Sequence, residues 1–193
     1  MKNIFSCFLL VFFVHINTGS VSAAPVYVGT EGCKCHKSEI ADWEFSKHAK
    51  AFDLLKAGEK KSSKKKAKLD PDKDYSSDEK CLKCHATGYK EEGGFVDENS
   101  TPAMAGVGCE SCHGPGSDYR ALHKDKSLSF TRAEAKGHGA TYGSVDEAVC
   151  DVCHKGKENP FTPEVDKKYT FVHSDALKEN RSFHDYYELE GTH

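Results

Sequence analysis

Apolar residues beyond the first two dozen positions recur at helical spacings. Between Ser38 and Ala57, Ile40, Trp43, Phe52 and Leu55 are spaced as on one helix face, and Gly58 follows as a terminator. This pattern predicts a helix over 38–57.

Three further helices are predicted from their end signals, over 76–88, 144–156 and from Ser174 toward Gly191. The first two open with Ser-x-x-Glu, the sequence of a capping box, and close with glycine. Glycine- and proline-rich turns or loops are expected between the helices, at 92–94, 106–108, 114–116 and 159–163. Only 168–172 has a strand-like pattern, so we expect a mainly α fold with little β structure.

The first 23 residues resemble a secretory signal. Lys2 precedes an apolar run from Ile4 to Val14, and Val21-Ser22-Ala23 forms a small-residue cleavage site. We therefore expect a signal peptide at 1–23 and one exported domain at 24–193, in the periplasm or an equivalent lumen. The apolar run is short and no second one follows, so no membrane span is expected in the mature chain; an uncleaved anchor is the alternative.

The composition is poor in apolar residues and rich in Cys and His. Only 37% of the 193 residues are hydrophobic, whereas nine Cys and 11 His are far more than an ordinary core needs. The net charge of −3 gives no indication of nucleic-acid binding. The lysine-rich stretch 56–68 either docks an acidic redox partner or is a solvated surface.

All Cys except Cys7, which lies in the signal, fall into four pairs that are each followed directly by His. The pairs are Cys33 and Cys35 with His36, Cys81 and Cys84 with His85, Cys109 and Cys112 with His113, and Cys150 and Cys153 with His154. The last three are Cys-x-x-Cys-His motifs, in which two thiols attach a haem and the imidazole binds its iron. We therefore predict four c-type haems that supply much of the buried apolar surface, with short helices and loops wrapped around them.

Structural zinc is the rival interpretation of paired Cys and His. Zinc requires pairs that combine into one tetrahedral site, and it has no use for a His after every pair. The repeated His therefore favours haem.

The first motif is shorter than the others. Only Lys34 separates Cys33 from Cys35, and Gly32 stands where the usual first Cys would be. A cysteine pair without haem and a haem held by one thioether are the alternatives, while His36 and a sufficient set of further His favour a fourth haem.

The mature chain offers six other His as second axial ligands: His48, His123, His138, His173, His184 and His193. A helix from His36 to His48 would separate them by roughly 18 Å, so His48 would serve another haem. Met104 is expected to be a packing residue. Bis-His ligation, and hence low potentials, is the expectation.

Several runs outside these motifs resemble the cytochrome c-554 family of tetrahaem proteins, which take electrons from hydroxylamine oxidoreductase. The matching positions cover nearly the whole mature chain in the same order: 43 and 46–51, 67–71, 73–75, 106–116, 161–166 and 189–191. The resemblance implies a mostly helical fold with four haems in closely spaced pairs.

The resemblance also implies a ligand set. His123 would complete the haem of His36, His48 that of His113, and His184 that of His154. The haem of His85 would be five-coordinate beneath the loop Asn159-Pro160-Phe161, unless His173 or His193 caps its iron. The shortened first motif and a shorter link from His154 to Pro160 depart from the family pattern.

The expected function is therefore electron transfer rather than catalysis. The protein would accept electrons from a donor like hydroxylamine oxidoreductase and pass them to a membrane or soluble cytochrome. Binding or reduction of nitric oxide at a five-coordinate haem is the enzymatic alternative, and a conducting filament is the structural one.

Overall fold

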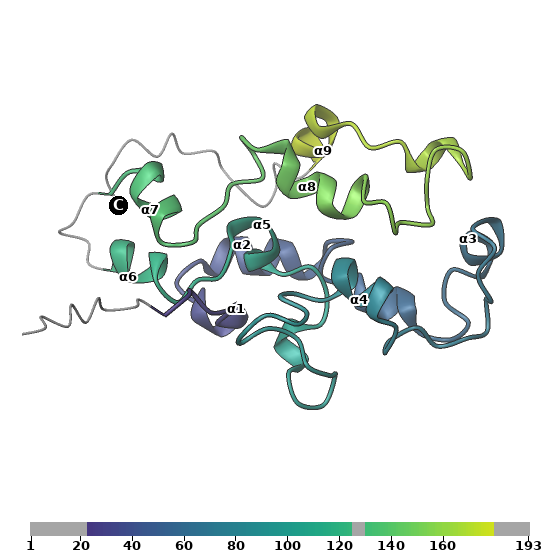
Figure 1. The fold of residues 1–193 in the computed structure, drawn as a ribbon, viewed down its shortest axis with the longest axis horizontal. Helices are drawn as coiled ribbons and strands as arrows, with labels where there is room; N and C mark the ends of the chain where they lie inside the picture. Colours follow the sequence, from purple (N-terminus) through teal and green to yellow (C-terminus); the bar gives the residue numbers. More distant parts are fainter. Residues whose placement is uncertain (1–22, 125–129, 180–193) are drawn as a thin grey trace, which may run out of the picture.

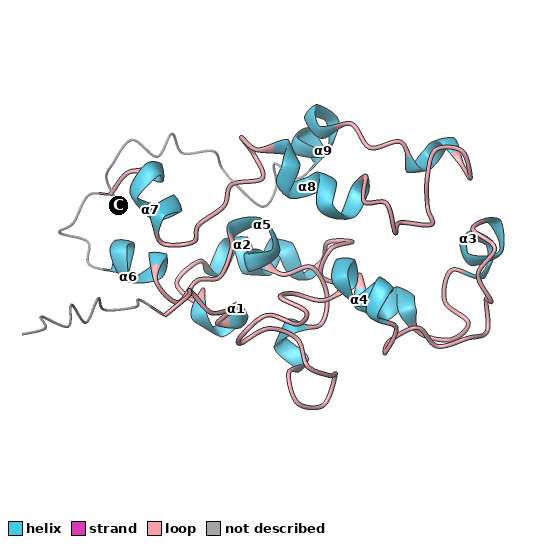
Figure 2. Cartoon of the chain, viewed as in Figure 1, coloured by secondary structure: helices cyan, strands magenta, loops and turns pink. Residues whose placement is uncertain are grey.

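The computed structural model describes residues 23–124 and 130–179, which form short helices joined by loops (Figure 1). Figure 2 shows no strand in these ranges, where two isolated bridges join Ala86 to Ala105 and Gly106. The helices are α1 Gly29–Gly32, α2 Lys37–Glu44, η1 Phe52–Leu55, α3 Lys61–Lys66, α4 Glu79–His85, η2 Pro102–Met104, α5 Cys109–His113, α6 Tyr119–Lys124, α7 Arg132–Gly137, α8 Glu147–His154, η3 Lys167–Tyr169 and α9 His173–Glu179. The predicted mainly α fold is confirmed. The strand-like 168–172 is instead the end of η3 and a loop.

The helices are arranged in two layers with additions at both ends. Helices α1, α2, α4 and α5 form the lower layer in Figure 1, and α8 and α9 lie above them. Helices α6 and α7 are at the left end of the molecule, and α3 is at the right end. Direct contacts join α1 to α5 and α4 to α8, which are far apart in the sequence. Among the described residues, no helix has the length and apolar character that crossing a membrane requires.

The caps of α4 and α8 differ from the prediction. Asp78 and Asp146, rather than Ser76 and Ser144, accept the hydrogen bonds of the first turns, at 3.0 Å and 3.1 Å. An Asp directly before the first helical residue is a good N-cap, and each serine lies two residues too early for that role. The expected capping boxes are therefore wrong at both sites.

The helix expected over 38–57 is interrupted. Helix α2 ends at Glu44, where Phe45 and Ser46 begin a series of tight turns, and the Ser46 hydroxyl accepts the Ala49 N–H at 3.0 Å. Such a side-chain bond competes with a continuing helix, and the chain becomes helical again only in η1. The predicted 18 Å rise between His36 and His48 therefore does not apply.

The hydrophobic core is small and lies around α4, η1 and η2. It consists of Phe52, Leu55, Tyr75, Leu82, Ala86, Phe95 and Met104. This confirms Met104 as a packing residue. None of the large described side chains is less than 2% exposed, as expected of a fold whose own apolar side chains supply only part of its buried surface.

Candidate haem-binding site

The three full motifs occupy equivalent places at the ends of helices. His85, His113 and His154 are the last residues of α4, α5 and α8. Within each helix the two Cys are three residues apart and therefore lie on one face. All eight described cysteines are free thiols, and both Cys of each full motif are partly buried. The donor set thus fits a haem attached at each of these helix ends, with an imidazole next to the second sulfur.

Motifs that are far apart in the sequence are neighbours in the fold, since α1, which leads into the first motif, packs against α5, and α4 packs against α8. The influence of Cys109 raises the pKa of Cys33, and that of Cys33 lowers the pKa of Cys109. In the same way Cys153 lowers the pKa of Cys84 to about 7, and Cys84 raises that of Cys153. The first motif therefore lies beside the third, and the second beside the fourth.

His85 has the hydrogen bond expected of an iron ligand. Its Nδ1 lies 2.6 Å from the Ala51 carbonyl oxygen, which fixes the ring and leaves Nε2 available to bind a metal. Burial lowers the pKa of His85, which favours the neutral imidazole that binds metal. Ala51 immediately precedes η1, so the turns after α2 orient the imidazole of His85.

His48 lies beside the fourth motif. Its ring centroid is 6.2 Å from that of His154, edge to face, and His154 stacks on Phe171 at 4.2 Å. Burial lowers the pKa of both His48 and His154. The ring of His113 meets Tyr142 edge-on at 6.2 Å. That His48 completes the haem of His113 stays a prediction.

A glycine loop joins two of these candidate ligands, His48 and His85, through the backbone. Gly106 N–H donates to the His85 carbonyl and Val107 N–H to the His48 carbonyl, both at 3.0 Å. Gly106 has a φ of +93°, and a Cβ there would approach the Ala49 carbonyl oxygen to 2.5 Å. The close approach requires glycine and holds the segments of His48 and His85 together.

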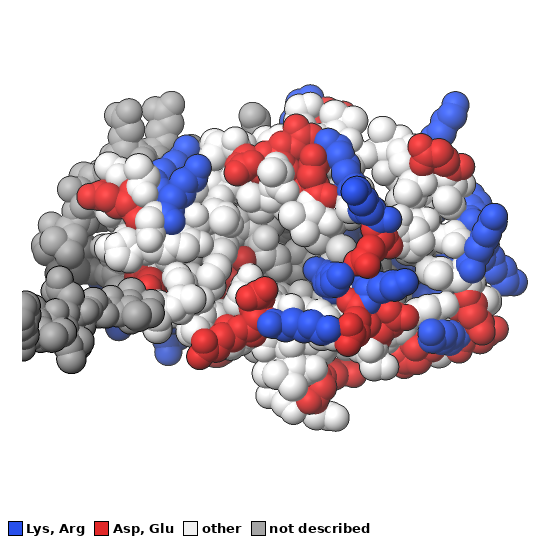
Figure 3. All heavy atoms as spheres, in the orientation of Figure 1, with Lys and Arg blue, Asp and Glu red and all other residues white. Residues whose placement is uncertain are grey.

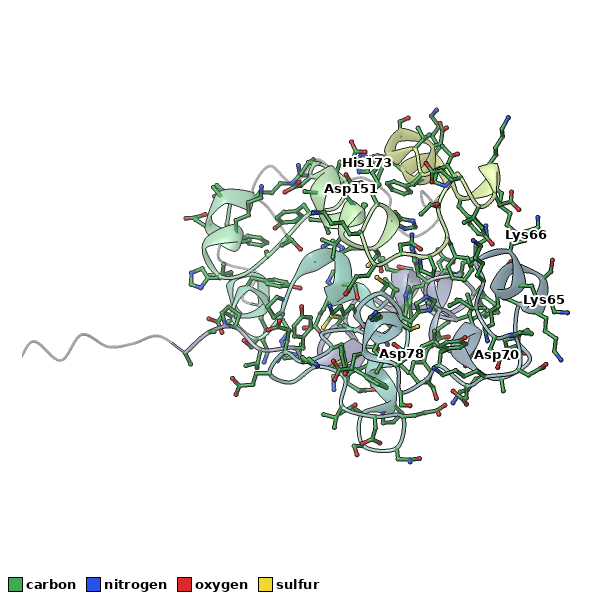
Figure 4. All side chains as sticks on the ribbon, turned by 45° about the vertical axis from the view of Figure 1, so that its right-hand side comes forward. Lys65, Lys66, Asp70, Asp78, Asp151 and His173 are labelled. Carbon is green, nitrogen blue, oxygen red and sulfur yellow. The ribbon has the colours of Figure 1, made fainter. Side chains whose placement is uncertain are left out.

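The remaining predicted or alternative ligands that the structure describes lie in or beside other helices. His36 is the N-cap of α2. His123 lies in α6, but its side chain, like His184 and His193, lies outside the described residues. His138 is the C-cap of α7. His173, near the top of Figure 4, places its Nε2 2.7 Å from the Gly143 carbonyl oxygen, before α8.

The loop Asn159-Pro160-Phe161 lies between the second and fourth motifs. The Asn159 carboxamide donates to the carbonyls of Cys153 and His154 at 3.2 Å and 3.3 Å, and its oxygen accepts Phe161 N–H at 2.9 Å. Just before the loop, Glu158 pairs with Lys83 of α4 at 2.7 Å. Asn159 therefore caps α8, and the ion pair holds this part of the chain against the helix that ends in His85.

Two buried polar residues, Glu110 and Thr87, organise the segments around the motifs. The Glu110 carboxylate, within the third motif, accepts backbone N–H bonds from Val28, Gly29 and Gly116. The Thr87 hydroxyl donates to the Gly106 carbonyl and accepts Gly108 N–H, both at 2.8 Å. No pattern in the sequence marks either residue, because their partners are backbone groups.

Three of the seven lysines in the stretch 56–68 form ion pairs. Lys56 pairs with Glu98, Lys61 with Asp72 and Lys66 with Asp166. Basic and acidic side chains alternate over the face shown in Figure 3, and Figure 4 shows Lys65 and Lys66 at the edge of the molecule. This arrangement favours the interpretation as a solvated surface over that of a docking patch.

The donor geometry bears on the zinc alternative as well. Across 23–124 and 130–179, no three side chains of His, Cys, Asp or Glu come together as a metal-holding group. The Cys pairs thus do not combine as a tetrahedral zinc site requires. Each Cys pair has its own adjacent imidazole, and this arrangement matches the attachment of one haem at each motif.

Helices that end in Cys-x-x-Cys-His motifs around a small core define a c-type cytochrome. Residues 32–114 match the family model described as cytochrome c554 and c-prime. Over 210 aligned residues, the chain is 37% identical to cytochrome c-554 of Nitrosomonas europaea, covering 99% of this chain and 89% of that protein. The solved reduced state of cytochrome c554 from the same organism superposes with a TM-score of 0.76 and 40% identity, covering 88% of this chain and 90% of the other.

The chain therefore belongs to the cytochrome c-554 family. It is an electron carrier that uses c-type haem, and redox partners are implied by that role. The comparisons do not favour the alternative of nitric oxide reduction.

Proposed function

We propose that this protein is an exported tetrahaem cytochrome that carries electrons from a donor like hydroxylamine oxidoreductase to a membrane or soluble cytochrome. The observation that carries the proposal is the packing of motif-bearing segments against each other, α1 against α5 and α4 against α8. Haems attached at neighbouring motifs would lie close enough to exchange electrons. Haem iron supplies the one-electron chemistry, and the protein fixes spacing, ligands and exposure.

The cysteine pairs would bind the four haems, with His36, His85, His113 and His154 as the first axial ligands. His48, His123 and His184 would be second ligands to three of the irons, and Asn159-Pro160-Phe161 would cover the remaining open position. The Asn159 bonds to α8 and the Lys83–Glu158 pair support this place for the loop, because they hold it between the second and fourth motifs.

Export is part of the proposal. The signal-like segment 1–23 supports a mature chain that begins at Ala24 in the periplasm or an equivalent lumen. N-terminal sequencing of the purified holoprotein tests this directly, and a mature chain that still carries Lys2 would contradict it.

Electron transfer is tested with the oxidised holoprotein, a purified hydroxylamine oxidoreductase and hydroxylamine. We expect the haems to become reduced at a rate that depends on the oxidoreductase concentration, followed by the visible bands of ferrous haem. Omitting the oxidoreductase is the control. Equal rates with and without it would contradict the proposed donor but not the family assignment.

The ligand assignment is tested by electron paramagnetic resonance. Replacement of His48 by Ala should convert one low-spin haem to high spin, whereas His138→Ala should leave the low-spin signals unchanged. Intact mass of the wild-type holoprotein counts the haems, and we expect four.

A further inference from the structure

The first motif is built differently from the other three. Helix α1 ends at Gly32 and α2 begins at Lys37, so the sequence Cys33-Lys34-Cys35-His36 lies in the turn between two helices. In that turn, Cys33 N–H donates to the Thr30 carbonyl and His36 N–H to the Cys33 carbonyl, both at 2.9 Å. The two thiols therefore do not share one face of a helix, as the pairs in α4, α5 and α8 do.

Cys33 follows α1 directly, and α1 packs against α5, which begins with Cys109 of the third motif. The carbonyl of the preceding Gly32 accepts a bond from Arg120 Nη1 at 3.0 Å. A Cβ added at Gly32 would lie 2.3 Å from Val28 Cγ2. The packing at Gly32 thus leaves no room for a Cys at the position that regular spacing would require.

Cys35 has the opposite surroundings. It is exposed, and it directly precedes His36 as the second Cys of each full motif precedes its ligand. This adjacency is the relation that places a thioether beside the iron. The spacing to Cys33 is one residue short, which is a step of about 3.8 Å between Cα atoms. The two vinyl groups of a rigid macrocycle are a fixed distance apart, so the shortened spacing does not present both thiols to them.

We propose that the first haem is attached through Cys35 alone, and that Cys33 of the mature protein is a free thiol. This inference rests on the proposed haem at His36. Cys33 would then be the one cysteine of the mature chain that a thiol reagent can modify. It lies where α1 packs against α5.

The attachment step is an addition. The Cys35 sulfur forms a bond to the inner carbon of one vinyl group, the thiol hydrogen moves to the outer carbon, and the carbon–carbon double bond becomes single. No atom is lost and no net oxidation occurs. The second vinyl of that haem keeps its double bond. Each attached haem therefore adds the same mass whether one or two thioethers form. The intact mass gives the number of haems, and a count of the remaining free thiols gives the number of thioether bonds.

The test uses the wild-type holoprotein, denatured in the presence of a phosphine reductant and treated with iodoacetamide. Thioethers survive this treatment, and any disulfide between two chains is opened. Intact mass gives the numbers of haems and carbamidomethyl groups, and peptide mapping locates the modified Cys. We expect four haems and one modified thiol, at Cys33.

The other outcomes overturn the inference in distinguishable ways. Four haems with no modified thiol would contradict the single thioether. Four haems with the label on Cys35 would contradict attachment through Cys35. Both results would leave the tetrahaem proposal intact. Three haems with labels on both Cys33 and Cys35 would refute the haem at His36, and with it this inference.

Two matched variants provide a second measurement. Cys33→Ser should retain four haems and lose the label, and Cys35→Ser should lose one haem. The pyridine haemochrome spectrum of the wild type should show an α-band displaced to longer wavelength for one haem in four, because its remaining vinyl stays conjugated. A spectrum with the band of doubly attached haem only would contradict the proposal even if neither variant folds.

Discussion

The carboxylate of Glu110 accepts a hydrogen bond from the backbone N–H of Gly29 at 2.7 Å, across 81 positions of the chain. Glu110 belongs to α5 and Gly29 opens α1, so this bond joins the third motif to the segment that leads into the first. The same carboxylate accepts N–H groups of Val28 and Gly116, and its side chain is only 2% exposed. A buried carboxylate surrounded by backbone donors is thus a structural centre between two motifs.

Replacement of Glu110 by Gln should destabilise the holoprotein by about 2 kcal/mol, because an amide has one acceptor oxygen and loses the charge-assisted bonds. Denaturant unfolding followed by far-UV circular dichroism measures this cost. Glu147→Gln in α8 is the control, since Glu147 makes an exposed pair with Lys155 and its loss should change stability by less than about 0.5 kcal/mol. Equal stability of both variants would show that Glu110 does not hold α1 to α5.

Replacement of Thr87 by Val should cost roughly 1–3 kcal/mol. Valine keeps the shape but removes the hydroxyl that bonds to Gly106 and Gly108, and it leaves their backbone groups without these partners. The same unfolding measurement applies, with Thr87→Ser as the control that retains the hydroxyl. A Val variant as stable as the wild type, or more stable than the Ser variant, would contradict the role of the hydroxyl.

Lys64 and Lys65 are neighbours in α3 with opposite environments. Lys64 is 4% exposed, and its Nζ donates to the Lys56 carbonyl at 2.7 Å, whereas Lys65 is exposed. Lys64→Met should therefore destabilise the protein by roughly 1–3 kcal/mol, through loss of a charged donor to a carbonyl. Lys65→Met should be nearly neutral. Thermal unfolding compares the two, and an equal effect would contradict the structural role of Lys64.

The Lys83–Glu158 pair should give a small contribution to stability that depends on pH. Lys83 lowers the pKa of Glu158 from its ordinary value of 4.5, and Glu158 raises that of Lys83 from 10.5. Stability from a lowered carboxyl pKa is present above 4.5 and is lost as pH falls through the folded value. Stability from a raised lysine pKa is present below 10.5 and is lost as pH rises through the folded value.

A double-mutant cycle with Lys83→Met and Glu158→Gln should therefore show coupling at neutral pH and none in acid. Both side chains are exposed, so high salt should also remove the coupling at neutral pH. Coupling that persists in acid would show that the contact is not electrostatic.

Local chemistry could be predicted from sequence, but the positions of helix ends could not. The helices predicted over 76–88 and 144–156 correctly carry the second and fourth motifs, although α4 and α8 are shorter than those ranges. The expected caps at Ser76 and Ser144 were wrong because Asp78 and Asp146 compete for the same N–H groups. The expected long helix over 38–57 was wrong because the turn at Ser46 ends it.

The neighbours of each motif depend on distant parts of the chain. Nothing near Cys84 in the sequence indicates Cys153, and nothing near Cys33 indicates Cys109. The same holds for the Ala51 carbonyl that orients His85. Backbone donors and acceptors are present at every residue, so only packing decides which of them meets a particular side chain.

The sequence by itself therefore determined the class of chemistry, because thiols and imidazoles at fixed spacing act within a single turn of backbone. The tertiary structure decided which motifs are adjacent, which acids and lysines are buried, and that the thiols of Cys33 and Cys35 face different surroundings. Those properties arise from contacts between segments up to a hundred residues apart, and the spacing of neighbouring residues in the sequence cannot predict such contacts.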